Sequence, residues 1–440
     1  MKTTTSTPES KKRQIWYYNL GTQVLISLIL GIVVGLTIPD MAIKFKFLGD
    51  IFLNLIKVGV APLVFLTIVH GISSAGDAKS AGRVGWRAFV YFEIVSTFAL
   101  IIGLTAGNIF KIGSSMSLMS GVPAPELKAS TTSASGAYEF LLHIVPDNFI
   151  GAFAKGELLQ VVVLAVMMGI GILAISVEQR SRVNSSLDMI SEILFSFINL
   201  VMKFAPLGTF GAIAYSVGSN GSNVLLALAE LVLVFYIVVA LFIVLGMGVI
   251  ARLTGFRIWH LLRYIKDELI IVFGTASSES VLPRLLIKLE KLGCAKQTVG
   301  LVLPTGYAFN LDGTSIFMSM GIMFISHAYG IPLSLEAQFG ILLLMLLTSK
   351  GAATVSGGSF VVFAATVTST NILPVEGLAL IFGVYRFMSI AIAICNTVGN
   401  SVATVVVAKW SGTFDQDIAS KYLTPEKDNL TSKKKEENIT

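Results

Sequence analysis

Long apolar runs alternate with short polar segments along most of the chain. Six such runs lie at 23–38, 52–68, 88–106, 158–175, from 194 onward, and at 224–250. Each is long enough, or nearly so, for a helix that crosses a bilayer, which needs about 20 predominantly apolar residues. The first run is long and is followed by no small-residue cleavage site, so we interpret it as an uncleaved span. The pattern predicts a multi-pass helical membrane protein.

The pattern changes after residue 256. Residues 264–292 form two short apolar pieces around a serine-rich stretch, and residues 340–368 repeat this design. Each piece is too short to span a bilayer. The segment between them, 299–325, is interrupted by Pro304, Gly306 and the run at 310–314. Irregular backbone and a carboxylate survive at membrane depth only where protein buries them or they line a cavity, so this interruption marks a candidate site.

Lysine and arginine positions set the expected orientation. Basic residues precede the first run, lie between the second and third, and follow the fourth and sixth: Lys11, Lys12, Arg13, Lys79, Arg83, Arg87, Arg180, Arg182, Arg252, Arg257, Arg263 and Lys266. The positive-inside rule then places both termini in the cytoplasm. It also favours a re-entrant hairpin at 264–292 over one full helix, because both ends of this segment are basic. The flanks of 340–368 carry no Lys or Arg, so this second hairpin should enter from the outside.

Two interrupted units with opposite entry sides form an inverted repeat, which is typical of secondary transporters with a site near the midplane. Half-helix N-termini would attract an anion, and the oxygens of a broken span suit a hard cation. Only 13% of the residues are charged, against about 25% in soluble domains. The net charge of +6 follows from the loop bias and needs no nucleic-acid partner.

Enzyme signals are absent from the sequence. It contains no HExxH, phosphate-loop or GxSxG motif, and Cys294 and Cys395 are too few and too far apart for a zinc site or a disulfide framework. We therefore expect no enzyme activity and no cofactor. A channel, an intramembrane enzyme and a transport-deficient sensor are weaker alternatives, because the polar groups gather at two tips and two breaks.

The chain resembles the dicarboxylate/amino acid:cation symporters, the glutamate-transporter homologues, and most closely their bacterial C4-dicarboxylate branch. The resemblance runs from about residue 19 to 409. It is carried by YFEIVST at 91–97, GTASSESVLP at 274–283, PTGYAFNLDGT at 304–314, SKGAA at 349–353, YRFMS at 385–389 and NTVGNSVATVVV at 396–407. It implies an all-α fold of eight transmembrane helices and two re-entrant hairpins. It also implies an elevator-type homotrimer in the bacterial inner membrane.

The resemblance implies the following division. Residues 1–18 form a cytoplasmic tail, 19–410 the membrane domain, and 411–440 a second cytoplasmic tail, which its composition predicts to be disordered. The scaffold lies mainly at 19–75 and 156–220. The transport domain lies mainly at 84–112 and 223–410, with hairpin one at 258–292 and hairpin two, the external gate, at 337–370.

The family's site residues carry over onto matching positions. They imply substrate contacts at Ser277, Ser278, Thr314, Val355, Ser356, Gly357, Ser389, Ile392 and Asn396. They imply cation contacts at Gly306, Asn310, Asp312, Asn396, Asn400, Ser96 and Thr97. The implied substrate is a small carboxylate, chiefly succinate, fumarate or malate. The coupling cation is Na⁺ or H⁺, and the sequence leaves this choice open.

Several of these residues have a second interpretation. Ser277 and Ser278 could also cap the second helix of hairpin one, a role compatible with anion binding. Asn396 could join helices, although the nearby break favours an ion site. Glu93 is either a carboxylate on the cation path or a hydrogen-bonding partner of a neighbouring helix. Arg386 either reaches the membrane rim or pairs with Glu279 at the tip of hairpin one.

The chain departs from its family inside the site. Ser389 replaces the aspartate that holds the substrate's amino group in the amino-acid branch, which argues against glutamate and aspartate as substrates. Ile392 replaces the arginine that binds the distal carboxylate, Asn400 replaces a cation-binding aspartate of the amino-acid branch, and Thr354 replaces a glycine. Two hypotheses follow. The substrate is a dicarboxylate whose charge Arg386 balances, or it is a monocarboxylate or other acid whose apolar end suits Ile392 and Ile394.

Overall fold

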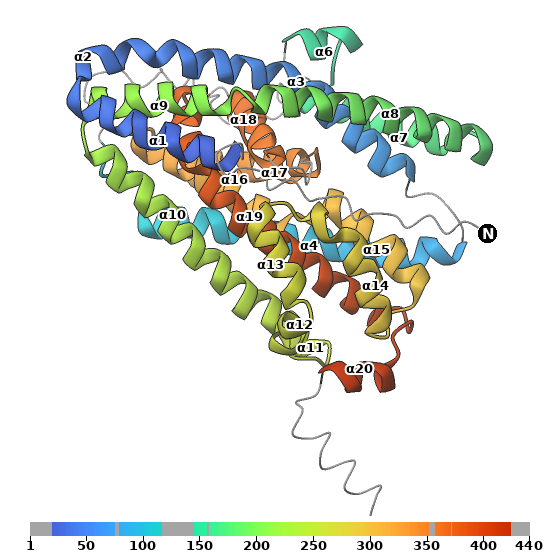
Figure 1. The fold of residues 1–440 in the computed structure, drawn as a ribbon. Helices are drawn as coiled ribbons and strands as arrows, with labels where there is room; N and C mark the ends of the chain where they lie inside the picture. Colours follow the sequence, from blue (N-terminus) through green and yellow to red (C-terminus); the bar gives the residue numbers. More distant parts are fainter. Residues whose placement is uncertain are drawn as a thin grey trace, which may run out of the picture.

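The computed structural model describes residues 20–74, 79–116, 145–155, 158–351, 357–370 and 372–423. Over these residues the chain is almost entirely helical, and Figure 1 shows how the helices are arranged. The first half contains α1 (Leu20–Thr37), α2 (Pro39–Ala42), α3 (Lys46–Ser74), α4 (Lys79–Phe110), α6 (Phe149–Lys155), α7 (Leu158–Leu173), α8 (Val177–Met202), α9 (Ala205–Asn220) and α10 (Asn223–Leu241). The second half contains α11 (Gly248–Leu253), α12 (Ile258–Tyr264), α13 (Lys266–Thr275), α14 (Leu282–Lys291), α15 (Lys296–Phe309), α16 (Asp312–Ala328), α17 (Leu335–Thr348), α18 (Gly358–Thr370), α19 (Glu376–Trp410) and α20 (Gln416–Leu423).

The described residues contain six helical segments that are long and apolar enough to cross a membrane. Four shorter apolar helices accompany them, at Thr22–Thr37, Val163–Leu173, Leu335–Thr348 and Gly358–Thr370. The predicted multi-pass, all-helical membrane protein is therefore confirmed. The count of eight transmembrane helices stays a prediction.

One group of helices is formed by α1, α3, α7, α8 and α9. Helix α9 packs along α1 and α3, and α3 also packs on α7 and α8. Helices α1 and α9 approach closely because α1 carries glycine at the contact. A Cβ atom added at Gly31 would lie 3.0 Å from the carbonyl oxygen of Phe210. Small residues allow this kind of close packing in membrane helices.

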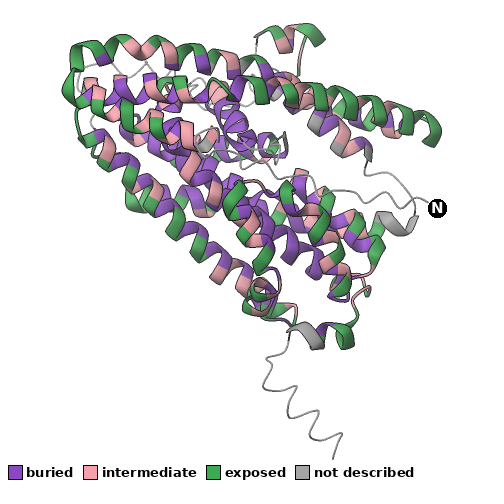
Figure 2. Cartoon of the chain, in the orientation of Figure 1, coloured by how far each residue is buried: buried purple, intermediate pink, exposed green. Residues whose placement is uncertain are grey.

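A second group surrounds α16 and α19. Helix α16 packs on α4 and α19, α15 packs on α19 and α4, and α10 and α13 lie along α19. Figure 2 shows that the buried residues are concentrated where these helices meet. Every residue of α16 except His327 is buried. The polar groups of α16, apart from His327, are therefore held away from both water and lipid.

The predicted interruption between 299 and 325 is confirmed, but it is shorter than the sequence suggests. Helix α15 continues through Pro304 and Gly306 and ends at Phe309, and α16 begins at Asp312. Proline removes one backbone hydrogen bond, and the surrounding turns keep the helix intact. The N–H of Asn310 donates to the carbonyl oxygen of Gly306 at 2.8 Å and closes α15. The break is thus confined to Asn310 and Leu311.

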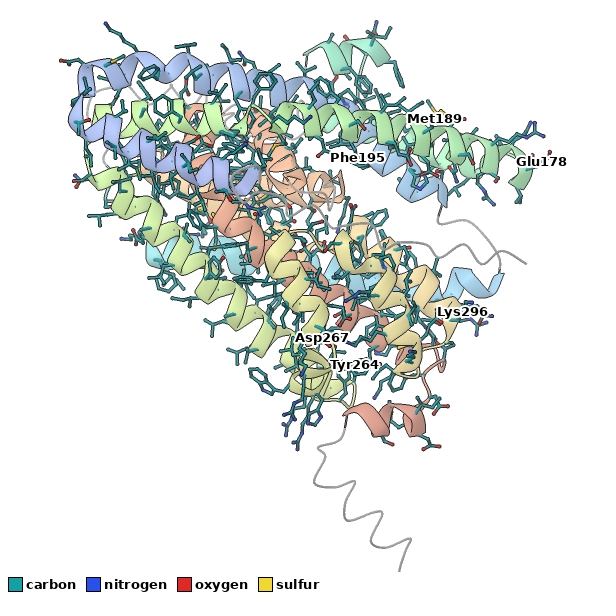
Figure 3. All side chains as sticks on the ribbon, viewed as in Figure 1. Glu178, Met189, Phe195, Tyr264, Asp267 and Lys296 are labelled. Carbon is teal, nitrogen blue, oxygen red and sulfur yellow. The ribbon has the colours of Figure 1, made fainter. Side chains whose placement is uncertain are left out.

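Arg180 and Arg182 follow the fourth run, as predicted, and both belong to the next helix, α8. The side chain of Ser176 caps this helix by accepting a hydrogen bond from the backbone N–H of Gln179. Arg182 pairs with Glu178 one turn away at 2.6 Å, a spacing that supports helices. Figure 3 shows the side chains of α8 from Glu178 to Phe195 along one continuous helix. The expected fifth run is divided into α8 and α9 at Lys203 and Phe204.

Both predicted hairpins consist of two short helices on either side of a tip. Helices α13 and α14 form hairpin one, whose base is joined by an ion pair of 2.6 Å between Lys288 and Glu268. Figure 3 labels Tyr264 and Asp267 at the end of this unit that lies away from its tip. Helices α17 and α18 form hairpin two. The side from which each hairpin enters the membrane stays a prediction.

The expected disorder of the tail after residue 410 is wrong for residues 411–423. The N–H of Asp415 donates to the carbonyl oxygen of Gly293 at 2.8 Å, and that of Ala295 donates to Thr413 at 2.9 Å. Helix α20 follows, and its Ala419 is buried. These backbone hydrogen bonds order the segment against the end of hairpin one. The predicted tails at 1–18 and 424–440 lie outside the described residues.

Candidate functional site

A small pocket lies where the two hairpins meet the middle of α19. Its empty volume is about 260 Å³, part of which is open to solvent. It is lined by Ala276, Ser278, Gly357, Ser359, Tyr385, Ser389, Ile392, Ala393 and Asn396. The lining combines hydroxyl and amide groups with apolar side chains. Such a mixture of a few convergent polar groups on an apolar wall is typical of small-molecule sites.

The structure brings five of the nine predicted substrate residues to this pocket: Ser278, Gly357, Ser389, Ile392 and Asn396. Ser277 does not line it. Thr314 is fully buried behind it, where its hydroxyl lies 2.8 Å from that of Ser359 and accepts a 3.3 Å hydrogen bond from Asn396. Val355 and Ser356 lie outside the described residues, as does Thr354.

Sequence reasoning missed four lining residues: Ala276, Ser359, Tyr385 and Ala393. Tyr385 carried a signal, because it opens the YRFMS stretch at 385–389 on which the family resemblance partly rests. Ala276 carried none. Its φ of 51° and ψ of 36° put a non-glycine residue in the left-handed region, where it ends α13. This conformation costs about 1–2 kcal/mol for an L-residue, and it turns the chain into the tip of hairpin one.

Ser278 is held by its backbone. The Tyr307 hydroxyl on α15 donates to the Ser278 carbonyl oxygen at 2.9 Å, and this contact ties the tip of hairpin one to the broken span. The alternative role of Ser278 as a side-chain cap is wrong, because the helical turn that follows it has no capping hydrogen bond from that side chain. Ser278 thus lines the pocket without capping this turn.

A second cluster lies at the break between α15 and α16. The Asn310 amide nitrogen donates to Asp312 Oδ2 and to Asn400 Oδ1, both at 3.2 Å. All three side chains are buried, with at most 1% exposed. The Oδ1 atoms of Asn310 and Asp312 have no hydrogen-bond partner among the described residues. Leaving buried oxygens unpaired is costly, and a hard cation is the ligand that such oxygens prefer.

Two glycines allow these groups to approach each other. A Cβ atom at Gly306 would clash with Asn400 Oδ1, and one at Gly399 would clash with Asp312 Oδ2. The predicted cation residues Gly306, Asn310, Asp312 and Asn400 are thus brought together. A cation could fit here only because neither helix carries a side chain at these two positions.

Asn396 joins the cluster to the pocket. Its Oδ1 accepts a hydrogen bond from the N–H of Gly313 at 2.8 Å, at the N-terminus of α16. It therefore links two helices and lines the pocket at the same time. Ser96 donates to the carbonyl oxygen of Phe309 at 3.4 Å, so it too reaches the break. Thr97 instead donates to the Glu93 carbonyl oxygen of its own helix at 2.6 Å.

Sequence reasoning also missed the partner of Glu93. Its carboxylate forms a 3.1 Å ion pair with Lys350, which follows the first helix of hairpin two. The same ammonium group donates to the Phe309 carbonyl oxygen at 2.9 Å. A lysine within an apolar hairpin tip was the available signal. Arg386 is half-buried on α19 and does not line the pocket, while Glu279 is exposed.

Comparison with known proteins gives a consistent result. The model of a family described as the sodium:dicarboxylate symporter family matches residues 20–410. A C4-dicarboxylate transport protein of Bacillus subtilis is 46% identical over 402 residues, which cover 91% of this chain and 95% of the relative. One from Laribacter hongkongensis is 48% identical, covering 91% of each chain. C4-dicarboxylate transport protein 2 of a Bradyrhizobium strain is 44% identical, covering 97% of this chain and 96% of its own length.

Proposed function

Because the chain belongs to the sodium:dicarboxylate symporter family, we propose that it takes up a C4-dicarboxylate together with Na⁺ or H⁺. Succinate, fumarate and malate are the proposed substrates. The observation that carries this proposal is the cluster of Asn310, Asp312 and Asn400, whose buried oxygens lie at a helix break next to a polar pocket. A cation site beside an anion site is what coupled uptake of an acid requires.

The start of α18 supports carboxylate binding at the pocket. Ser278 and Ser389 line the pocket, where the Ser389 hydroxyl donates to the Arg386 carbonyl oxygen at 2.8 Å, and α18 begins at its edge with Gly358. The N-terminus of a helix carries a partial positive charge and free N–H groups, both of which stabilise an anion. The pocket therefore offers attraction to a carboxylate without a lysine or arginine in its lining.

Asn396 supports coupling between the two sites. It contacts the N-terminus of α16 through Gly313 and lines the pocket from α19. A cation bound by Asn310 and Asp312 would order the break, and this would fix the position of Asn396. In the H⁺ version of the proposal, Asp312 would receive the proton. Cation binding would thereby raise substrate affinity, and by linkage the substrate would raise cation affinity equally.

We extend the proposal to the working unit. The transport domain, mainly 84–112 and 223–410, moves against the scaffold, mainly 19–75 and 156–220, in a homotrimer of the bacterial inner membrane with cytoplasmic termini. Hairpin two acts as the external gate. The packing supports this division, because α15 and α16 make their main contacts with α4 and α19, and α1 makes its main contacts with α9.

The relatives' names favour a dicarboxylate over a monocarboxylate, although Ile392 lines the pocket. The test uses purified protein in liposomes with an imposed Na⁺ or H⁺ gradient. Labelled succinate, fumarate, malate, aspartate and lactate are compared. We expect accumulation of the C4-dicarboxylates above the external concentration under one of the gradients. Failure to accumulate any acid under either gradient would refute symport, and accumulation of lactate alone would refute the substrate class.

A further inference from the structure

We propose that Lys350 is a tethered cation, which hairpin two delivers to the break between α15 and α16 in place of a second mobile cation. The inference rests on the Na⁺ form of the proposed function, because it concerns how many cations the transport site needs, and a wild-type protein without any Na⁺ response would overturn it. It assigns a role to a residue outside both predicted sets of site residues.

The surroundings of the Lys350 ammonium resemble those of a bound metal cation. Its Nζ atom lies 2.9 Å from the Phe309 carbonyl oxygen and 3.1 Å from Glu93 Oε1. Phe309 is the last residue of α15, and the final carbonyls of a helix have no intrahelical partner and carry partial negative charge. The Phe309 carbonyl oxygen also accepts from Ser96 at 3.4 Å. A carbonyl oxygen and a carboxylate are the ligands that hard cations select.

Burial makes this arrangement specific. The Lys350 side chain is only 10% exposed, and a buried ammonium is costly unless it is paired and hydrogen-bonded. The Glu93 side chain is 33% exposed and lies on α4, so the pair joins hairpin two to another helix. Phe309, whose carbonyl oxygen the ammonium contacts, precedes Asp312 of the oxygen cluster by three residues.

The charges around the break predict how Lys350 affects Na⁺ binding. Glu93 and Asp312 contribute two negative charges, and Lys350 contributes one positive charge. One monovalent cation then balances the remainder. Without the ammonium, two negative charges would remain, and a mobile cation near them would meet no repulsion from Lys350. Removing the ammonium should therefore strengthen Na⁺ binding.

The Lys350 ammonium belongs to hairpin two, the proposed external gate, so its position depends on whether the gate is closed. Lys350 follows α17, and Gly357 and Ser359 at the start of α18 line the pocket. The ammonium and the pocket wall thus belong to one hairpin. When the hairpin leaves the break, it takes the charge with it.

The test measures Na⁺ binding without substrate. Purified full-length protein in detergent is heated in NaCl and choline chloride mixtures of constant ionic strength, and the midpoint of unfolding is followed against Na⁺ concentration. Lys350→Met is compared with wild type and with Lys288→Met. Lys288 is a matched control, since it forms a comparable ion pair with a buried glutamate at the base of hairpin one.

We expect Lys350→Met to require about tenfold less Na⁺ for half-maximal stabilisation than wild type, within the range of about 5- to 150-fold that coupled ligands reach. Lys288→Met should keep the wild-type Na⁺ response. An unchanged Na⁺ response in Lys350→Met would overturn the proposal and leave Lys350 as a structural partner of Glu93.

Glu93→Gln keeps the test decisive should Lys350→Met fail to fold. It removes one negative charge and should raise the half-maximal Na⁺ concentration, while an unchanged value would overturn the proposal. The liposome experiment is independent of these measurements. If the variants shift the Na⁺ response but the wild-type protein shows no uptake, symport alone is refuted. If uptake occurs but the variants leave the Na⁺ response unchanged, the tethered-cation proposal alone is refuted.

Discussion

Asp312→Asn tests the oxygen cluster most directly. The substitution keeps the size of the side chain and removes its charge. Asp312 is fully buried, its Oδ2 accepts a hydrogen bond from Asn310, and its Oδ1 has no partner among the described residues. Asparagine can preserve the first contact through its own oxygen. The change therefore isolates the charge that a bound cation would meet.

The expected loss of cation affinity follows from the burial of Asp312. Removing one member of a buried charge pair costs about 2–5 kcal/mol. At about 1.4 kcal/mol per tenfold change, this corresponds to a loss of about 30- to 4,000-fold in cation affinity. An exposed pair would lose far less, since its median contribution is about 0–1 kcal/mol. The two ranges do not overlap, so the measured loss distinguishes a buried cation site from a surface charge.

The assay is succinate uptake into liposomes, with the coupling cation titrated on the outside. Asp188→Asn is the matched control, because Asp188 is an exposed carboxylate on α8 that pairs with His70 at 3.4 Å. It should leave the cation dependence unchanged. Asp312→Asn should abolish accumulation at cation concentrations that saturate wild type. Uptake by Asp312→Asn with the wild-type cation dependence would refute the assignment of the cluster as a cation site.

Three further predictions address the pocket, the packing and the thiols. Ile392→Arg should raise succinate affinity by at least about tenfold, measured by isothermal titration, and tight wild-type binding that this variant weakens would contradict the argument. Gly399→Ala should weaken the response of the unfolding midpoint to the coupling cation, because its Cβ would clash with Asp312 Oδ2; an unchanged response would show that the cluster adapts. Burial raises the pKa of the Cys294 thiol to about 12, so the reactive thiolate is scarce at pH 7. In a Cys395→Ala background, maleimide labelling should be slow in the folded protein and rapid after denaturation, and rapid labelling of the folded protein would contradict the buried position.

The broken helix could be predicted because its sequence violates the apolar pattern. Asn310 and Asp312 stand inside a membrane-length segment, where polar groups are expensive. The short apolar pieces predicted the two hairpins for a similar reason, since neither piece is long enough to span. The pattern could not predict which residues the break between α15 and α16 contains. Pro304 looks like a helix breaker in sequence, yet α15 continues through it because the adjacent turns remain hydrogen-bonded.

Contacts between distant segments could not be predicted from pattern alone. The ion pair of Glu93 and Lys350 joins residues 257 positions apart. The hydrogen bond of Asp415 to Gly293 orders the start of a tail that its composition predicts to be disordered. Local periodicity contains no information on such pairings. The helical character of Arg180 and Arg182 was missed for a different reason. Their charges resemble a loop, whereas the capping serine and the pair with Glu178 stabilise a helix.

The pocket restricts how a dicarboxylate can be held without an arginine at Ile392. Arg386 precedes Ile392 by six residues on α19, which places it about 9 Å away along the axis and about 240° around it. Arg386 can therefore serve a carboxylate only near Tyr385 and Ser389, at the opposite end of this stretch. The carboxylate nearer Ile392 must be held by neutral donors such as the Asn396 amide, one turn further along. Since neutral hydrogen bonds are roughly half as strong as charge-assisted ones, the proposed function requires the second carboxylate to be bound more weakly than an arginine at this position would bind it.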